Sequence, residues 1–338
     1  MRERLILFAV LVAAAGLAAL LVLPRGKLPP PEPPAEEPLE PLPSKARVPA
    51  PLAARDAGLS SIDAGPPPLP SYVHVDPRSP AECGPGMVLV DGLYCPYVGY
   101  RCLDWVNEPL DICARYGPDV ICEGALEKRA FCIDVFEYPN LDGVVPAVMA
   151  SYRDAERACE VEGKRLCRVA EWEMACEGSQ MWPYPYGTER DADACNIDRE
   201  GPSKRSRAAR AEHDLEDPWK VSDEVERVDR RAASGSSPRC ISPHGVRDLT
   251  GNVEEWVDDP LAKAMNRPFR SALEGGGAGR SKARCRAADN SHDRGFSSPE
   301  VGFRCCRDAK TSPPESPAGG VTMPRVHRMP DPPARPTP

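Results

Sequence analysis

The sequence predicts an α+β domain that contains much irregular structure and is stabilised by disulfide bonds. All 14 cysteines lie between Cys83 and Cys306, which places the folded part of the 338-residue chain in that interval. Within it, only a few short segments have strand or helix patterns, and residues 178–242 show no sustained hydrophobic period. Such an interval can bury one sizeable core, and disulfides compensate where regular structure is sparse.

Two short strands are predicted from runs of apolar and β-branched residues. Residues 86–92 read Gly-Met-Val-Leu-Val-Asp-Gly and end in a turn, and residues 131–136 read Phe-Cys-Ile-Asp-Val-Phe. Runs of this length that are bounded by turn residues favour strands over helices.

Two helices are predicted from their end signals. Ser151 is followed three residues later by Asp154, which is typical of a capping box, and apolar residues then recur at helical spacing as far as Gly163. A second helix is expected over residues 169–176, closed by Gly178.

Residues 1–27 are predicted to be a transmembrane signal-anchor or a cleaved signal peptide. Residues 5–23 carry no charge and would span about 28 Å as a helix, enough to cross a hydrocarbon core. Basic residues flank both sides, so charge does not fix the orientation. Either outcome exports the domain: it is periplasmic or at the cell surface when anchored, and secreted when the segment is cleaved.

Proline-rich segments flank the cysteine-containing interval. The chain has 41 prolines, which are concentrated before and after that interval. We expect residues 28–80 to be a semi-rigid linker and residues 309–338 to be a disordered tail, because neither segment can bury enough apolar area to fold.

The cysteines indicate disulfides rather than zinc. Their number is even, no Cys-x-x-Cys occurs, and the five histidines lack the close spacing of zinc ligands. Residues 81–130 form a cysteine-rich N-terminal extension of the domain, and the pairing of its cysteines cannot be read from the sequence.

The net charge argues against a nucleic-acid partner. The formal charge is −8 and the pI is about 5.4, whereas binding to phosphates needs a basic surface. We therefore expect no nucleic-acid partner and a membrane contact only through the N-terminal segment.

Several motifs occur in a fixed order between residues 158 and 305. They are Ala158-Cys159, Gly163-Lys164-Arg165-Leu166, Glu171-Trp172-Glu173, Tyr184-Pro185-Tyr186-Gly187, Cys195-Asn196-Ile197-Asp198, Gly245-Val246-Arg247-Asp248-Leu249-Thr250-Gly251-Asn252-Val253-Glu254-Glu255-Trp256, Gly275-Gly276 and Gly302-Phe303-Arg304-Cys305. Together they resemble the signature of the formylglycine-generating enzyme (sulfatase-modifying factor) family. The resemblance implies a duplicated, C-type-lectin-like α+β fold over residues 131–308.

One segment departs from the oxidising members of this family. Those enzymes hold Cu(I) with two thiols that follow the Gly-Gly turn, and paired thiolates suit this soft metal. The corresponding residues 277–284 contain no cysteine. Copper and a catalytic residue are therefore not expected here, and Glu254 stands where the family usually has a tryptophan.

The resemblance also implies two disulfides, Cys159 with Cys305 and Cys176 with Cys285. The adjacent Cys305 and Cys306 are expected to have separate partners, because a bond between neighbouring residues forces unusual backbone geometry. Trp172 and Trp256 are expected to be core residues, and Arg304 is expected to make an internal charge-assisted hydrogen bond.

Structural calcium is the one cofactor that the resemblance implies. One site would use Asn196 and the carbonyl of Ile197. A second would use Asp248, the carbonyls of Gly251 and Val253, and the carboxylate of Glu255. Such oxygen ligands are those that calcium prefers.

These observations predict a membrane-tethered, extracytoplasmic binding or scaffolding module whose partner is a protein or glycan of the cell envelope. An alternative is an oxidoreductase that converts a sulfatase cysteine to formylglycine with thiols placed elsewhere. A third is an envelope partner that binds a sulfatase peptide without oxidising it. Complete disulfide pairing favours the module, and two reactive thiols favour the enzyme.

Overall fold

The computed structural model describes residues 69–199, 229–279, 282–310 and 325–328. The predicted membrane segment, most of the linker and most of the tail lie outside these residues. No helix among the described residues has both the length and the apolar character needed to cross a membrane.

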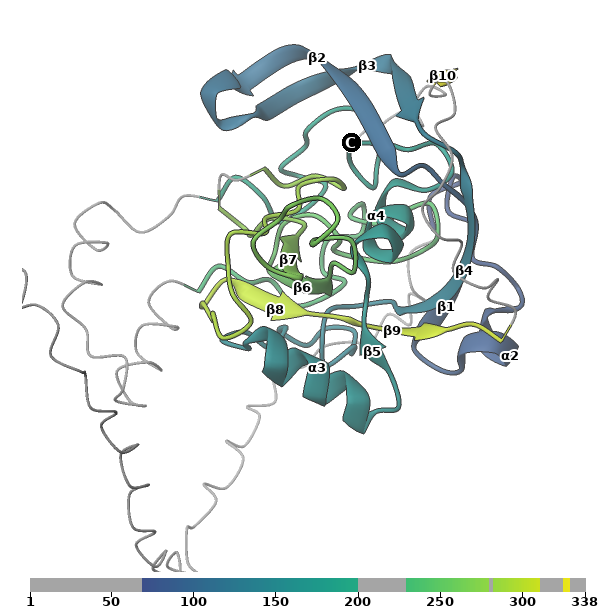
Figure 1. Ribbon diagram of the computed structural model, residues 1–338, viewed down its shortest axis with the longest axis vertical. Helices are drawn as coiled ribbons and strands as arrows, with labels where there is room; N and C mark the ends of the chain where they lie inside the picture. The colour runs from purple at the N-terminus through teal and green to yellow at the C-terminus, as the bar shows by residue number, and fades with distance from the viewer. Residues whose placement is uncertain (1–68, 200–228, 280–281, 311–324, 329–338) are drawn as a thin grey trace, which may run out of the picture. The chain divides into compact units, whose positions relative to one another are not determined.

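Both predicted strands lie in one four-stranded sheet (Figure 1). Its order is β1 (Met87–Tyr94), β4 (Glu127–Asp134), β9 (Cys305–Asp308) and β5 (Arg165–Leu166), and all neighbours are antiparallel. The strands begin and end a few residues away from the predicted bounds. The sheet joins the first and last parts of the domain, because β4 and β5 both pair with β9 near the C-terminal end.

The cysteine-rich extension forms a long hairpin that the sequence did not predict. Strand β2 (Tyr97–Asn107) and strand β3 (Ile112–Glu123) are antiparallel and joined by the 3₁₀ turn η1 (Glu108–Leu110). Four register shifts interrupt the ladder, so the strands lack the strict alternation that marks a strand in a sequence. The hairpin extends over the rest of the domain (Figure 1).

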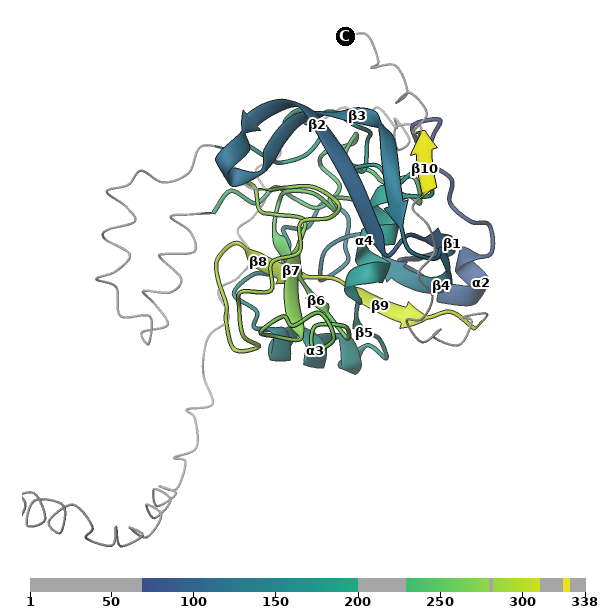
Figure 2. The same cartoon turned by 45° about the horizontal axis from the view of Figure 1, so that its top comes forward.

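A short strand from the tail completes the hairpin sheet. Strand β10 (Arg325–Arg328) pairs antiparallel with β3, with Arg325 opposite Cys122, so the strand order is β10, β3, β2 (Figure 2). These four residues lie in the tail predicted to be disordered, and there the prediction was wrong. Backbone hydrogen bonds to the exposed edge of β3 stabilise this strand, although the composition of the tail does not favour folding.

A third sheet lies in the second half of the domain. Strand β6 (Glu254–Asp258) lies in the middle, antiparallel to β7 (Ser271–Glu274) and parallel to β8 (Val301–Phe303). Between residues 178 and 242, the described part contains turns and isolated bridges but no helix or strand, as the missing hydrophobic period indicated.

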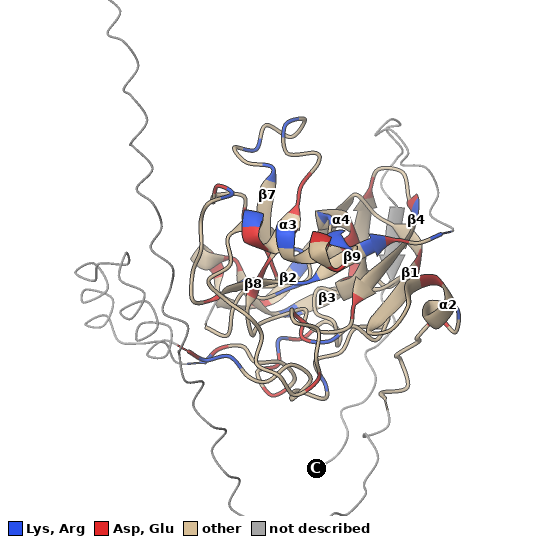
Figure 3. Ribbon diagram, turned by 90° about the horizontal axis from the view of Figure 1, so that it is seen from below, with Lys and Arg blue, Asp and Glu red and all other residues tan. Residues whose placement is uncertain are grey.

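Both predicted helices are confirmed, and a short helix, α2 (Ser79–Cys83), precedes β1. Helix α3 (Tyr152–Val161) begins at Ser151, whose hydroxyl accepts from the backbone N–H of Asp154 while the Asp154 carboxylate accepts from the Ser151 N–H. Charged residues of both signs lie along this helix (Figure 3). Helix α4 (Val169–Glu177) ends at Gly178, which has a positive φ of 64°.

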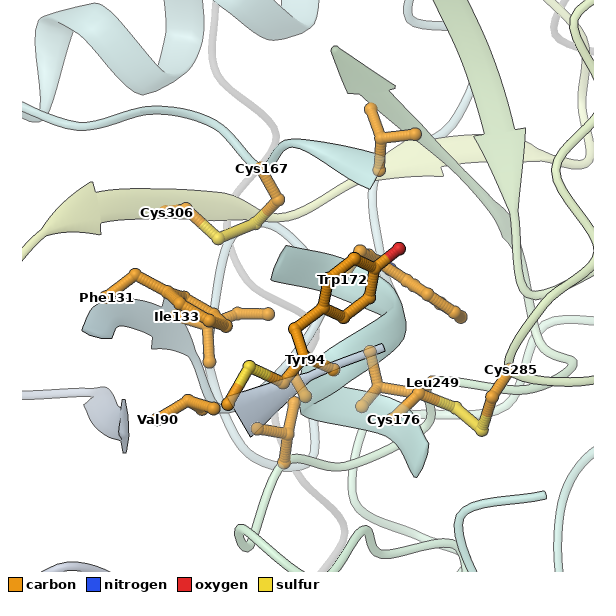
Figure 4. Close-up of a cluster of buried hydrophobic side chains, with 14 of the residues drawn as sticks. Val90, Tyr94, Phe131, Ile133, Cys167, Trp172, Cys176, Leu249, Cys285 and Cys306 are labelled. Carbon is orange, nitrogen blue, oxygen red and sulfur yellow. A yellow bond between two sulfur atoms is a disulfide. The ribbon is translucent and has the colours of Figure 1, made fainter. Parts of the chain in front are cut away.

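The core packs around two buried tryptophans, and the fold class, α+β and disulfide-stabilised with much irregular structure, is confirmed. Trp172 of α4 and Trp256 of β6 are both 0% exposed, each in its own apolar cluster. In the Trp172 cluster, the Cys167–Cys306 and Cys176–Cys285 disulfides take part in the packing (Figure 4).

Candidate functional site

Every cysteine of the chain is paired. The seven disulfides leave no free thiol, and all 14 cysteines lie among the described residues. The pairs are Cys83–Cys132, Cys95–Cys122, Cys102–Cys113, Cys159–Cys305, Cys167–Cys306, Cys176–Cys285 and Cys195–Cys240. Two of them, Cys159–Cys305 and Cys176–Cys285, are the pairings that the family resemblance implied.

The two adjacent cysteines of β9 attach different parts of the domain to one strand. Cys305 bonds to Cys159 of α3, whereas Cys306 bonds to Cys167, just before α4. Neighbouring residues of a strand point to opposite faces, so the two sulfurs reach different segments of the chain. The structure thus gives them separate partners, as expected.

The family resemblance matches the residues after the Gly-Gly turn to the copper-binding segment of the oxidising enzymes. Gly275 and Gly276 have φ values of +84° and +64°, in the left-handed region. A Cβ on Gly275 would lie 2.8 Å from the carbonyl oxygen of Leu249, so only glycine fits without a shift. The backbone N–H of Gly251 donates to the carbonyl of Gly275, which fixes the turn against the neighbouring loop.

The side chains after this turn alternate between the core and the hairpin. Ala283 and Cys285 are fully buried, and Cys285 is bonded to α4. Arg284 points the other way and donates to Asp111 at 2.8 Å and to the Tyr116 hydroxyl at 3.1 Å, both at the hairpin. The segment is therefore held on both sides.

Arg286 makes a second connection to the extension. Its Nη2 donates to the carbonyl of Cys95 at 2.7 Å, and its Nε and Nη2 contact the two oxygens of Glu177 at 2.7 Å each. The residues after the Gly-Gly turn are thus attached to the N-terminal extension through both Arg284 and Arg286, a contact that the sequence analysis did not predict.

Glu254 is mostly buried near the start of this segment. A Cβ on Gly277 would lie 4.0 Å from the Glu254 Cγ and 3.8 Å from the Glu300 Cβ. Burial, together with Glu300 and Asp289, raises the pKa of Glu254 to about 7. The replacement of the family tryptophan thus introduces an acid beside the turn.

A buried ion pair lies at the centre of the domain. Arg304 is 0% exposed and contacts both oxygens of Glu255 at 2.6 Å, as expected from the sequence. The Trp172 indole N–H also donates to Glu255, at 2.8 Å. Both carboxylate oxygens of Glu255 are therefore engaged by protein donors.

A second buried carboxyl group, missed in the sequence, lies near this pair. Glu137 is 0% exposed and accepts from Ser234 at 2.7 Å and from the Asn252 side chain at 2.9 Å. Burial, and then Asp248 and Glu255, hold its pKa well above the usual range. Burial also raises the pKa of Asp248 to about 6.

The structure brings the two predicted calcium-ligand sets into contact. The backbone N–H of Asn252 donates to the carbonyl of Asn196 at 2.9 Å. Gly251 lies so close to Asn196 and Ile197 that a Cβ would be 2.4 Å from atoms of both. Val253 is buried beside them. The backbone arrangement is compact, as the motif indicated.

The side-chain oxygens of these sets already accept hydrogen bonds from protein donors. Glu255 is bound to Arg304, and the Asn196 side-chain oxygen accepts from Arg199 at 2.9 Å. Asp248 accepts from the Gly235 N–H at 2.6 Å. Among the described residues, no group of three or more histidine, cysteine, aspartate or glutamate side chains could hold a metal. Calcium therefore stays a prediction.

Known proteins resemble this chain over part of its length. The formylglycine-generating enzyme of Thermomonospora curvata is 30% identical over 121 residues, which is 34% of this chain and 33% of that enzyme. The chain thus matches about a third of the length of this relative.

Two solved structures are also similar. PvdO from Pseudomonas aeruginosa is 17% identical, with 66% of this chain and 94% of that chain covered and a TM-score of 0.41. CarF is 15% identical, with 66% and 97% covered and a TM-score of 0.41. The family model of the sulfatase-modifying factor enzyme 1-like domain matches residues 139–309, about half of the chain. The chain therefore belongs to this family.

Proposed function

We propose that the chain is a membrane-tethered, extracytoplasmic binding module in which the family domain does not catalyse the oxidation of a cysteine. The pairing of all 14 cysteines carries this proposal. A Cu(I) site built from cysteine needs thiolates, and a sulfur in a disulfide cannot serve as one.

The contacts of the segment after the Gly-Gly turn support the same conclusion. In this chain the segment offers Arg284 and Arg286, and both are engaged by the extension. Guanidinium groups do not bind a cation such as copper, because they carry only hydrogen-bond donors and a positive charge. The segment acts here as an attachment for the hairpin.

Seven disulfides support an oxidising compartment for the domain. Residues 5–23 serve as the tether and the proline-rich residues 28–68 as the spacer that holds the domain away from the membrane, because residues 69–80 belong to the folded domain, where helix α2 begins at Ser79. The partner is a protein or glycan of the cell envelope, which this location makes accessible.

The alternative is an oxidoreductase that generates formylglycine on a sulfatase. Its support is the 30% identity to the enzyme of Thermomonospora curvata over a third of each chain. For this chain to use the same copper chemistry, one disulfide would have to open and release two neighbouring thiols.

A thiol count combined with an oxidation assay separates the two functions. The full-length protein is denatured without reduction, alkylated and analysed by mass spectrometry. The protein is also incubated with Cu(I), oxygen and a sulfatase cysteine peptide, and aldehyde is detected with a hydrazide. We expect seven disulfides and no aldehyde. Two alkylated cysteines together with aldehyde formation would replace the module with the enzyme.

A further inference from the structure

A cavity of about 420 Å³ lies between the first sheet, helix α4 and the loop that follows β6. This volume is in the range of small-ligand sites. None of residues 275–286 lines the cavity, so it is separate from the segment that corresponds to the copper site.

The cavity has apolar walls and an aromatic residue at its mouth. Its apolar lining includes Phe131, Val169, Ala170 and Met265, and Tyr97 is 51% exposed among the lining residues. An apolar stem would replace water along these walls, which is favourable.

The basic residues that line the cavity all have acidic partners. Three of the ion pairs are Arg129 with Glu127, Arg267 with Asp259, and Arg168 with Glu171. Lys128 pairs with Asp91. Because each cation has a carboxylate, the cavity offers no unbalanced positive charge for an anion.

Among the described residues, one lining carboxylate, Glu173, shares its cation Arg286 with Glu177. Glu173 is 7% exposed and accepts from the Tyr94 hydroxyl at 2.5 Å through Oε2. Arg286 is 3.3 Å from the same oxygen, but Glu177 holds that guanidinium at two points. The other oxygen of Glu173, Oε1, accepts no hydrogen bond from any described residue.

The surroundings of Glu173 are short of positive charge. Glu274 is 0% exposed, and its Oε1 has no hydrogen-bond partner among the described residues. Burial, and then Glu173, hold the pKa of Glu274 well above the usual range. Arg286 is the guanidinium that contacts both Glu173 and Glu177, and Arg267 also acts on Glu274.

We propose that this cavity binds a cation on an aliphatic stem, of the kind that a lysine side chain of a partner protein presents, with Glu173 Oε1 as its acceptor. The stem lies along Val169, Ala170 and Met265, and the ammonium group donates to Glu173. Long basic side chains combine an apolar stem with a charged end, and this matches the walls and the acceptor.

The inference rests on the proposed binding function, since it names the chemistry of the ligand. The two can fail separately. Detection of formylglycine synthesis would overturn the proposed function and leave the amine site in place, whereas loss of amine binding would leave the disulfide count unchanged.

The test titrates the full-length protein with n-pentylamine at neutral pH in phosphate buffer, which contains no competing amine. 1-Pentanol serves as the neutral ligand of the same shape. We expect one amine site of millimolar affinity and at least about tenfold weaker binding of pentanol, the difference that a hydrogen bond between charged groups supplies.

Three variants complete the test. Glu173→Gln keeps the shape of the side chain and should weaken amine binding at least about tenfold. Ala170→Phe fills the cavity and should abolish it, whereas Glu160→Gln, on the exposed face of α3, should not change it. Thermal unfolding identifies any variant that is misfolded. Equal binding of amine and alcohol, no amine binding by the parent protein, or full amine binding by a folded Glu173→Gln or Ala170→Phe variant would each overturn the proposal.

Discussion

Arg304 and Glu255 form an ion pair with two short contacts in which neither side chain reaches solvent: the guanidinium is 0% exposed and the carboxylate 1%. Arg304 also donates to the carbonyls of Val135 and Arg247. The pair thereby connects the end of β8 to β6 and to the loop that precedes Gly251 and Asn252.

Removal of one partner of this pair should be strongly destabilising. Arg304→Met leaves Glu255 buried without its cation, and we expect a loss of about 3–5 kcal/mol in the free energy of unfolding. The measurement is urea unfolding followed by tryptophan fluorescence. Arg270→Gln at the exposed end of the Arg270–Asp258 pair is the control, with an expected loss below about 1 kcal/mol. Equal effects would mean that burial of the Arg304 pair has no energetic consequence.

The disulfides should differ in the stability that they contribute. Cys176–Cys285 closes a separation of 109 residues and Cys102–Cys113 one of 11. Chain-entropy arguments give about 5 and about 3 kcal/mol for these loops. Replacing both cysteines of each pair by serine and comparing denaturant midpoints tests the order. A larger loss for the hairpin pair would show that strain or unfolded-state structure outweighs loop length.

The contact between Arg284 and Asp111 should hold the hairpin on the domain. Arg284→Ala removes the donor to Asp111 and Tyr116, so amides of residues 104–116 should exchange with deuterium faster, while amides of α3 should not. Hydrogen exchange with mass spectrometry provides both readouts in one experiment. Lys282→Ala is the matched control, because Lys282 is 3.9 Å from Asp111 and more exposed. Unchanged exchange in the hairpin would place its attachment elsewhere.

Acid should weaken the fold through His244. Burial, and then His74, lower the pKa of His244 to about 4, below its ordinary value of 6.5. Between these pH values the unfolded chain binds a proton that the folded chain does not, so stability falls as the pH drops from about 6.5 towards 4. At pH 5 the loss from this group reaches up to about 2 kcal/mol.

The variant His244→Leu tests this pH dependence. It should reduce the difference between urea midpoints measured at pH 7 and pH 5, whereas His292→Gln, at a partly exposed histidine stacked on Phe296, should leave the difference as it is. A His244→Leu variant with the full acid dependence would assign the effect to other groups.

Calcium should have little effect on stability if the side chains keep their arrangement. Because Arg304 engages both oxygens of Glu255 and Arg199 engages Asn196, we expect the melting temperature to be the same in EGTA and in millimolar calcium. Magnesium serves as the control ion. A rise in melting temperature with calcium alone, lost in Asp248→Ala, would restore the calcium site that the resemblance implies.

The sequence predicted the features that depend on near neighbours. The capping box joins Ser151 to a residue three positions on, and the Gly178 stop acts on its own helix, so both helices were found close to their observed ends. The hairpin was missed because its bulges break the alternation, and β10 was missed because its partner lies about 200 residues earlier.

For the candidate site, the sequence identified the missing thiols but not what replaces them. The absence of cysteine from residues 277–284 is a property of the chain alone. That Arg284 contacts Asp111, and that Glu137 lies beside Asp248, follows from folding segments together over more than 100 positions. Periodicity within a short window of the sequence does not predict contacts between such distant residues.

By itself, the sequence determined the disulfide-rich α+β class, the two helices and the membership of the sulfatase-modifying factor enzyme 1-like domain family, because composition, short-range periodicity and ordered motifs are properties of the chain. Only the tertiary structure decided how the other ten cysteines pair, that the extension contacts the segment after the Gly-Gly turn, and that Glu173 lines a cavity and shares its cation with Glu177. The physical reason is that disulfides, ion pairs and cavities depend on distances between side chains that are far apart in the sequence, and folding alone sets those distances.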